Sequence, residues 1–208
     1  DPYNPQLRLL MANAYINDGR KFEAKKELYR ALELDSTFAE AYCNLGVVLH
    51  SQGYAKKAET NYEIALSLDS TLVEARAGLG TLLCRSERQV EGLEHLEAVI
   101  LLDPDHRGAL YNMAVAYHQV EDFKKAIEYF EDLLHIQADY PGARINLARA
   151  YYSLGLLRLQ AEQTDLAIAA FEQAVGYEAD NSNMHFARGL AYLEAEKLPD
   201  AEASFTRA

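Results

Sequence analysis

The chain has no tryptophan, only two cysteines and five prolines, and no long apolar stretch. Two cysteines, Cys43 and Cys84, cannot build the disulfide framework of a small exported domain, and so low a number fits a reducing compartment. No apolar run approaches the length of about 18 residues that a membrane-spanning helix needs, and no targeting segment is present. These absences exclude a membrane span and leave the compartment open between the cytoplasm and the periplasm.

Basic residues are also scarce. The 208 residues include 20 Lys and Arg against 32 Asp and Glu, which gives a formal net charge of −12. Binding to nucleic acid depends on clustered Lys and Arg that neutralise phosphates. The composition therefore excludes nucleic acid as a partner.

The sequence matches itself when it is shifted by 34 residues, which indicates a repeat protein. A small residue recurs once in each period, and a large residue recurs three positions later. The small row is Ala12, Gly46, Gly80, Ala114 and Ala148, and the large row is Tyr15, Leu49, Leu83, Tyr117 and Tyr151. The repeats begin near Pro5, Ala39, Val73, Arg107 and Pro141.

A second small row shows where the register slips. This row runs through Ala24, Ala58, Gly92 and Ala126, and its next member falls at Ala167 rather than at Gln160. Seven residues have therefore been added in the fifth repeat, within the stretch 154–167. The pattern then resumes, which gives six repeats near 5–38, 39–72, 73–106, 107–140, 141–181 and 182–208.

Each repeat contains two helical patterns with a short break between them, such as "NDGRK" or "SQGYA". Small residues at matching places allow two antiparallel helices to approach closely. We therefore expect Gly46, which costs about 1 kcal/mol inside a helix, to make room for the partner helix. Because one such pair cannot bury its apolar stripe alone, the repeats are predicted to stack into an all-α solenoid.

The spacing of Ala58, Tyr62 and Ala65, and that of Ala126 and Phe130, resembles the tetratricopeptide repeat (TPR), whose period is also 34. The resemblance covers residues 5–208. The position that holds tryptophan in the family is occupied here by Arg8, Tyr42, Arg76, Leu110, Arg144 and His185. The resemblance implies a right-handed superhelix of helix-turn-helix repeats that forms a single domain over residues 1–208.

The resemblance also implies that the first helices of the repeats line a concave groove, where a protein or peptide partner binds without a cofactor. Asn44, Asn112 and Asn146 share one row, and asparagine can both donate to and accept from a peptide backbone. An alternative role for these asparagines is to bridge neighbouring helices of the scaffold. The further candidate contact residues are Tyr111, Val115, Ile145 and Tyr152 for apolar contact and Arg149 for charge.

One TPR subfamily clamps the C-terminal carboxylate of chaperones with two Lys, two Asn and one Arg. Here Asn13 and Asn44 match, but the cationic places hold Leu9, Glu74 and Gly78, so chaperone-tail binding is not expected. Three other functions stay open. One is a TPR lipoprotein that assists assembly of a bacterial pilus or secretin, because residues 24–35, 61–70 and 80–85 are similar to that family. The others are a regulatory domain of a larger enzyme, such as a glycosyltransferase, and a homo-oligomer formed through the solenoid ends.

No motif in the sequence indicates a metal site or a catalytic function. His50, Cys84 and His118 lie one period apart, but neighbouring solenoid helices are about 8–10 Å apart, too far for three such residues to hold one metal ion. The patterns GxxxxGK[ST], HExxH and GxSxG are missing. The sequence therefore predicts a non-catalytic scaffold with no metal.

The seven added residues are expected to lengthen the first helix of the fifth repeat by about two turns, over residues 156–163. Thr164 or Asp165 is then expected to cap the next helix. Leu156, Leu157 or Leu159 would lie partly exposed on the extension. These leucines would either form a contact site or pack on the end of a neighbouring second helix.

Overall fold

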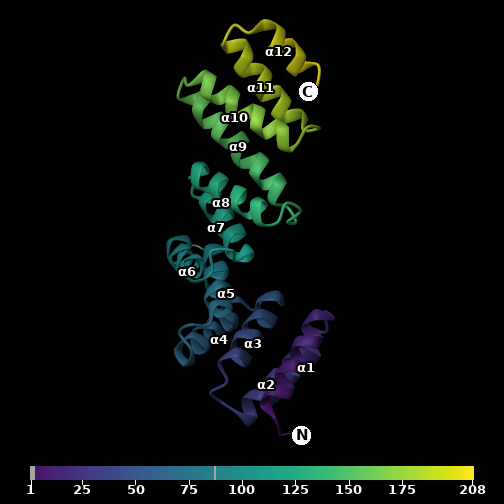
Figure 1. Cartoon of the computed structure of the whole chain (residues 1–208), viewed down its shortest axis with the longest axis vertical. Helices are drawn as coiled ribbons and strands as arrows, with labels where there is room; N and C mark the ends of the chain where they lie inside the picture. The colour runs from purple at the N-terminus through teal and green to yellow at the C-terminus, as the bar shows by residue number, and fades with distance from the viewer. Residues whose placement is uncertain (1–2, 87) are drawn as a thin grey trace. The chain divides into compact units, whose positions relative to one another are not determined.

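The computed structural model describes residues 3–86 and 88–208, and every regular element in these ranges is an α-helix (Figure 1). The all-α prediction is confirmed. The chain divides into two compact units, residues 1–109 and residues 110–208, which we call unit 1 and unit 2. The division falls inside α7 (Arg107–Gln119).

Unit 1 consists of three helical pairs and the first residues of α7. The pairs are α1 (Pro5–Asn17) with α2 (Lys21–Leu34), α3 (Ala39–Ser51) with α4 (Ala55–Leu68), and α5 (Val73–Cys84) with α6 (Gln89–Leu102). Each first helix packs against its own second helix, and α3 also contacts α1, α2 and α5. This arrangement is the stacking of helical hairpins that the 34-residue period predicts.

Unit 2 contains the rest of α7 and five further helices. They are α8 (Phe123–Ile136), α9 (Ala143–Gln160), α10 (Thr164–Tyr177), α11 (Ser182–Glu194) and α12 (Leu198–Phe205). Here α9 contacts α8, α10 and α11, and α11 packs against α12. The first helices begin at the expected repeat starts Pro5, Ala39, Val73 and Arg107, whereas the fifth begins at Ala143.

The turn between the two helices of a repeat has a left-handed residue at a fixed place. Gly19 and Gly53 fill this place in the first two repeats, with φ of 72° and 83°. Glu121, Glu162 and Glu196 fill it in the fourth, fifth and sixth, with φ of 62°, 57° and 58°. Glycine adopts this conformation at no steric cost, whereas a residue with a Cβ is strained there.

In the second, fifth and sixth repeats the core of the hairpin contains a close contact between a glycine and a ring. A Cβ added to Gly46 would lie 2.7 Å from Cε1 of Tyr62, which is fully buried, and one added to Gly189 would lie 2.6 Å from Cε1 of Phe205. Gly46 therefore makes room for the partner helix, as expected from the sequence. A Cβ added to Gly78 of α5 would overlap the same Tyr62 ring, at 2.6 Å from Cε1.

The glycine–ring contact of the fifth repeat shows that the inserted residues lie elsewhere than predicted. Gly155 on α9 lies against Phe171 of α10, and a Cβ there would be 2.6 Å from Cε1 of the ring. Gly155, not Ala148, therefore takes the place of Gly46 in the fifth repeat. Five residues of α9 follow Gly155, as five residues of α3 follow Gly46, so the C-terminal end of α9 has the ordinary length.

The extra residues thus lie before Gly155, and the predicted extension over residues 156–163 is wrong. They lengthen α9 to 18 residues, against 13 in α3, and enlarge the loop that precedes it. Leu156 and Leu157 are half-exposed as expected, but they occupy ordinary positions, and Leu159 packs partly buried against the cluster around Phe171. The predicted caps are also wrong, because the N-cap of α10 is Gln163 and Thr164 donates to Glu194 Oε1 at 2.9 Å.

Candidate functional site

The eight candidate contact residues fall into both units, so two surfaces are described separately. Asn44 belongs to unit 1, and the remaining seven belong to unit 2. In unit 2 they lie on α7 and α9, two first helices that touch directly. We use the name first-helix face for the exposed surface of α7, α9 and α11 that includes Val115, Ile145, Arg149, Leu156 and Phe186.

Two hydrogen bonds join α7 to α9 beneath this face. Asn146 Nδ2 donates to the hydroxyl of Tyr111 at 2.8 Å, and Ser153 Oγ lies 3.3 Å from Nε2 of His118. The Tyr111 ring is further held by Tyr140, with ring centroids 5.4 Å apart. Tyr111 and Asn146 therefore hold neighbouring helices together, which is the bridging role considered as an alternative for the asparagines.

The corrected register changes which residues share the row of Asn44. In the fifth repeat Ser153 stands two residues before Gly155, as Asn44 stands two before Gly46. Asn146 lies two helical turns earlier on α9. The expected row of Asn44, Asn112 and Asn146 is therefore not one structural row, although all three side chains are half-buried.

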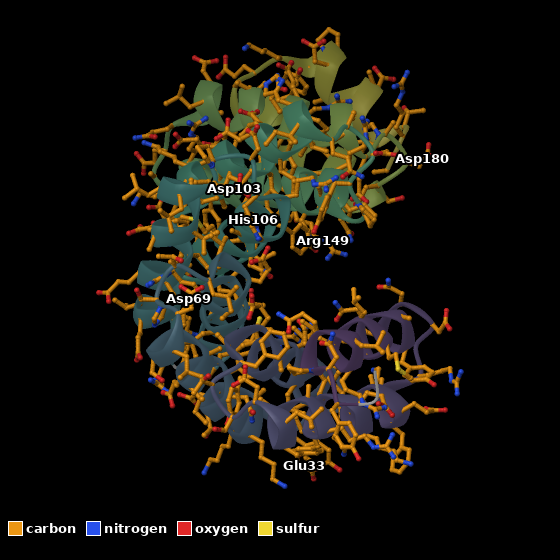
Figure 2. All side chains as sticks on the ribbon, turned by 60° about the horizontal axis from the view of Figure 1, so that its bottom comes forward. Glu33, Asp69, Asp103, His106, Arg149 and Asp180 are labelled. Atoms are coloured by element: carbon orange, nitrogen blue, oxygen red, sulfur yellow. The ribbon has the colours of Figure 1, made fainter. Side chains whose placement is uncertain are left out.

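Several apolar side chains of unit 2 remain exposed on the first-helix face. Ile145 is 45% exposed and Leu156 is 42% exposed on α9, and Phe186 and Leu190 are 51% and 41% exposed on α11. Arg149 lies between the two α9 residues in sequence, and its side chain extends away from the helices of its unit (Figure 2). Tyr152 is half-buried, because its ring packs on Phe171 with centroids 5.8 Å apart.

Leu156 is a further candidate contact residue, which sequence reasoning placed on the predicted helix extension. It follows Gly155 directly, as Val47 follows Gly46 and Leu190 follows Gly189. All three side chains are exposed to a similar degree, at 42%, 39% and 41%. The signal that identifies Leu156 is the pair Gly155 and Phe171, which has the spacing of Gly46 and Tyr62.

In unit 1, Asn44 joins α3 to α1. Its Nδ2 donates to Oδ1 of Asn13 at 2.7 Å, so the two matching asparagines of the chaperone-binding pattern are bonded to each other. The row has no asparagine in the third repeat because Gly78 must leave space for Tyr62. Packing therefore explains the break in the row.

A pocket of about 740 Å³ opens in unit 1 between the ends of α3 and α5 and the start of α4. His50 and Arg85 line it beside apolar Val47 and Leu82, and none of its lining residues is acidic. Burial lowers the pKa of His50, and the charge of Arg85 lowers it further. At neutral pH this pocket therefore carries a neutral imidazole and one cation.

The side chains of His50, Cys84 and His118, which lie one period apart in the sequence, have different environments. Cys84 is buried, with Sγ 3.9 Å from the carbonyl oxygen of Gln89, and burial raises the pKa of its thiol to about 11. Burial likewise lowers the pKa of His118, whose ring lies edge-on to Phe123. Among residues 3–86 and 88–208, no group of three His, Cys, Asp or Glu side chains is placed to hold a metal ion.

The repeated hairpins, the left-handed turn residue and the glycine–ring contacts define an all-α helical-repeat solenoid. Models of the tetratricopeptide repeat match residues 12–53, 39–72, 105–177 and 152–208, which together span most of the chain. The chain belongs to the TPR family, whose members act as scaffolds for protein interactions. No curated protein matches the chain.

Solved structures of TPR proteins have the same fold. The chain is 21% identical to YrrB, described as a TPR protein with an unusual peptide-binding site, with a TM-score of 0.68 over 95% of this chain and 94% of that one. It is 21% identical to PilF of Pseudomonas aeruginosa, with a TM-score of 0.67 over 97% and 88% of the two chains. A TPR protein of Parabacteroides merdae is 18% identical, with a TM-score of 0.63 over 96% and 77%.

None of the helices in the described ranges combines the length and the apolar character that crossing a bilayer demands.

Proposed function

We propose that this chain is a non-catalytic adaptor that binds a peptide segment of a protein partner on the first-helix face of unit 2. One observation carries the proposal: Ile145, Leu156, Phe186 and Leu190 are each about half-exposed on neighbouring first helices, with the cation of Arg149 among them. Exposed apolar side chains grouped with arginine and aromatic residues are typical of the centre of a protein interface.

The polar residues of this face would serve the same partner. Asn146 donates one Nδ2 hydrogen to the hydroxyl of Tyr111, so its Oδ1 can accept a hydrogen bond from a backbone amide of a bound segment. In unit 1, Asn44 donates one Nδ2 hydrogen to Asn13 in the same way, and it stays a candidate contact residue of that unit by itself. In unit 2, Asn112 and Asn146 would contact the partner. Val115 and Tyr152 supply apolar surface between them.

The likeness to YrrB supports a peptide as the ligand, because that protein is described as having a peptide-binding site. The lack of any motif or residue cluster for catalysis in the sequence supports a binding role rather than an enzyme. A partner that supplies an extended segment would bury its apolar side chains against Leu156 and Leu190 and an acidic one against Arg149.

The test is selection of binding peptides from a displayed random library, followed by affinity measurements on variants. The double variant Ile145→Ser, Arg149→Ala should weaken the selected peptides about tenfold or more. The matched control is Ile136→Ser on α8, which removes an isoleucine of similar exposure, 41% against 45%, away from the first-helix face. Unchanged affinity in the double variant, or an equal loss in the control, would remove the proposal.

A second candidate is a TPR lipoprotein that assists assembly of a bacterial pilus or secretin. The observation that favours it is the similarity of residues 24–35, 61–70 and 80–85 to that family, together with the shared fold of PilF. Expression of this chain in a bacterium that lacks its pilus-assembly TPR lipoprotein is the direct test. Restored pili would support the candidate, and their absence despite a folded, correctly located protein would refute it.

A further inference from the structure

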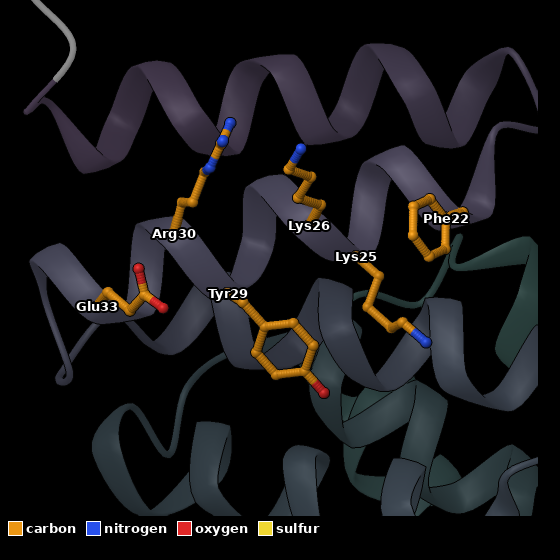
Figure 3. A pocket seen from close by; sticks show the side chains of 6 residues that line it. All are labelled: Phe22, Lys25, Lys26, Tyr29, Arg30 and Glu33. Carbon is orange, nitrogen blue, oxygen red and sulfur yellow. The ribbon is translucent and has the colours of Figure 1, made fainter.

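Helix α2 of unit 1 carries an exposed basic and aromatic surface. We call it the α2 patch. It lines a shallow pocket of about 370 Å³ formed by Phe22, Lys25, Lys26, Tyr29, Arg30 and Glu33 (Figure 3). Their spacing of three and four residues places these side chains in two adjacent rows on a broad face of the helix. In Figure 3, Lys25 and Tyr29 mark one edge of this face and Lys26 and Arg30 mark the other.

The α2 patch differs from the same surface of the other second helices. Tyr29 stands where the next four repeats each have a glutamate, namely Glu63, Glu97, Glu131 and Glu172. Helix α2 contains four basic and three acidic residues, whereas α6 contains three acidic residues and no Lys or Arg. Among the second helices of the described ranges, α2 alone has more basic than acidic residues.

The side chains of the α2 patch are available for a ligand. Phe22 is 71% exposed and Tyr29 is 49% exposed. Neither Lys25 nor Lys26 forms an ion pair with any residue in the described ranges, whereas Arg30 Nη1 is bonded to Glu27 Oε1 at 2.6 Å. Two free ammonium groups beside two exposed rings form a surface that complements carboxylates next to apolar groups.

We infer that the α2 patch binds an acidic segment of a protein partner, with carboxylates on Lys25 and Lys26 and an apolar side chain against Phe22 and Tyr29. An anionic membrane surface would also attract lysines and rings. It is disfavoured because the whole chain, at −12, would be repelled by an extended negative surface, whereas a short segment meets only the local charge. This site is separate from the proposed peptide site of unit 2.

The experiment uses the full chain and an array of synthetic 12-residue peptides. Each peptide has several glutamates and one Phe, Tyr or Leu, and a second set has glutamine in place of every glutamate. Binding is measured by fluorescence anisotropy at low and at physiological salt. We expect the acidic set to bind, the glutamine set not to bind, and affinity to fall as salt rises.

Two matched variants locate the binding. Lys25→Gln with Lys26→Gln should weaken the acidic peptides about tenfold, since two charge contacts are lost. The control Lys56→Gln with Lys57→Gln removes the same charge from two adjacent exposed lysines of α4 and should leave affinity unchanged. Phe22→Ser should reduce the preference for peptides that carry an aromatic residue.

Three results would overturn the inference. One is no binding by any acidic peptide, and another is an equal loss in the α2 and α4 variants, which would indicate a general charge effect. The third is binding to vesicles of phosphatidylserine and phosphatidylcholine that the α2 variant abolishes while the acidic peptides do not bind. Since the first-helix face is untouched by these variants, peptides selected on unit 2 should bind them normally, so the two proposals fail independently.

Discussion

Gly155 of α9 lies directly against the ring of Phe171, in the same way that Gly46 of α3 lies against Tyr62. In each pair the two helices of one repeat lie so close together that only glycine, which has no Cβ, fits at the contact. This contact fixes the register of each hairpin, and therefore decides which side chains of the first helix are exposed on the first-helix face.

We predict that Gly155→Ala lowers the free energy of unfolding by about 2 kcal/mol, because the added methyl group overlaps a buried ring. Gly176→Ala is the control, since a Cβ on this helical glycine meets nothing within 4 Å. It should raise stability by about 1 kcal/mol through helix propensity alone. Urea denaturation measures both, and a stabilising effect at position 155 would contradict the packing described here.

Two tyrosines are bonded to glutamates of the preceding second helix. Tyr151 donates to Glu131 Oε1 and Tyr192 donates to Glu172 Oε1, both at 2.5 Å. Burial, together with the bonded carboxylate of Glu172, raises the pKa of Tyr192 to about 12. Tyr151→Phe should cost about 1.5 kcal/mol of stability, since it removes a hydrogen bond to a charged group. Tyr177→Phe, which keeps the stacked ring, should cost much less, and equal losses would show that the hydrogen bond contributes nothing.

Substitution of glutamate by glycine should change the free energy of unfolding in opposite directions at a left-handed turn residue and at a nearby helical residue. Glu121 has φ of 62°, so Glu121→Gly should raise the free energy of unfolding by about 0.5–1 kcal/mol. Glu128 lies exposed within α8, where the same substitution should lower it by about 1 kcal/mol. Thermal unfolding monitored by circular dichroism distinguishes the two, and a loss at both positions would mean that the strain at Glu121 is already relieved.

Stability should fall in two steps as the pH is lowered. Burial is the main cause of the lowered pKa of His50, His95 and His118, whose ordinary value is 6.5. Below about pH 6.5 the unfolded chain therefore binds more protons than the folded one, and the free energy of unfolding decreases. Hydrogen bonds from Thr37 and Thr71 lower the pKa of Asp35 and Asp69 below 3.8, so a further loss follows near and below that pH.

The pH prediction is checked by urea titrations between pH 7.5 and 3. His118→Gln should lose less stability than the unsubstituted chain between pH 7 and 5.5, because one neutral buried imidazole has been removed. A profile that is flat over this interval in the unsubstituted chain would rule out a contribution from the histidines.

The sequence was sufficient to predict the helices and their pairing, because the 34-residue period and the small residues record the packing directly. The position of the insertion could not be read in the same way. Ala148 and Gly155 are both small and lie seven residues apart, so either register places a small residue on the inner side of α9. Only the partner ring, Phe171, distinguishes them, because it lies sixteen residues after Gly155 as Tyr62 lies after Gly46.

The candidate site shows a similar limit. Asparagine is equally suited to hold a peptide and to bridge two helices, and residue type does not reveal which bond it makes. The bonds of Asn44 to Asn13 and of Asn146 to Tyr111 depend on how far apart the neighbouring helices lie. Residue spacing along the chain carries no information on that distance.

The lengthened α9 shows how a repeat can gain residues and keep its packing contacts. Ala148 and Gly155 lie seven residues apart on α9, almost two complete turns at about 3.6 residues per turn, so both lie on nearly the same side of the helix. Tyr151, three residues after Ala148, therefore bonds to Glu131 of the preceding repeat while Gly155 meets Phe171 of its own repeat. A spacing of five or nine residues would turn one of these two contacts away from its partner. A repeat of this kind can therefore gain residues without losing either contact when the spacing between the two contacts stays close to whole helical turns.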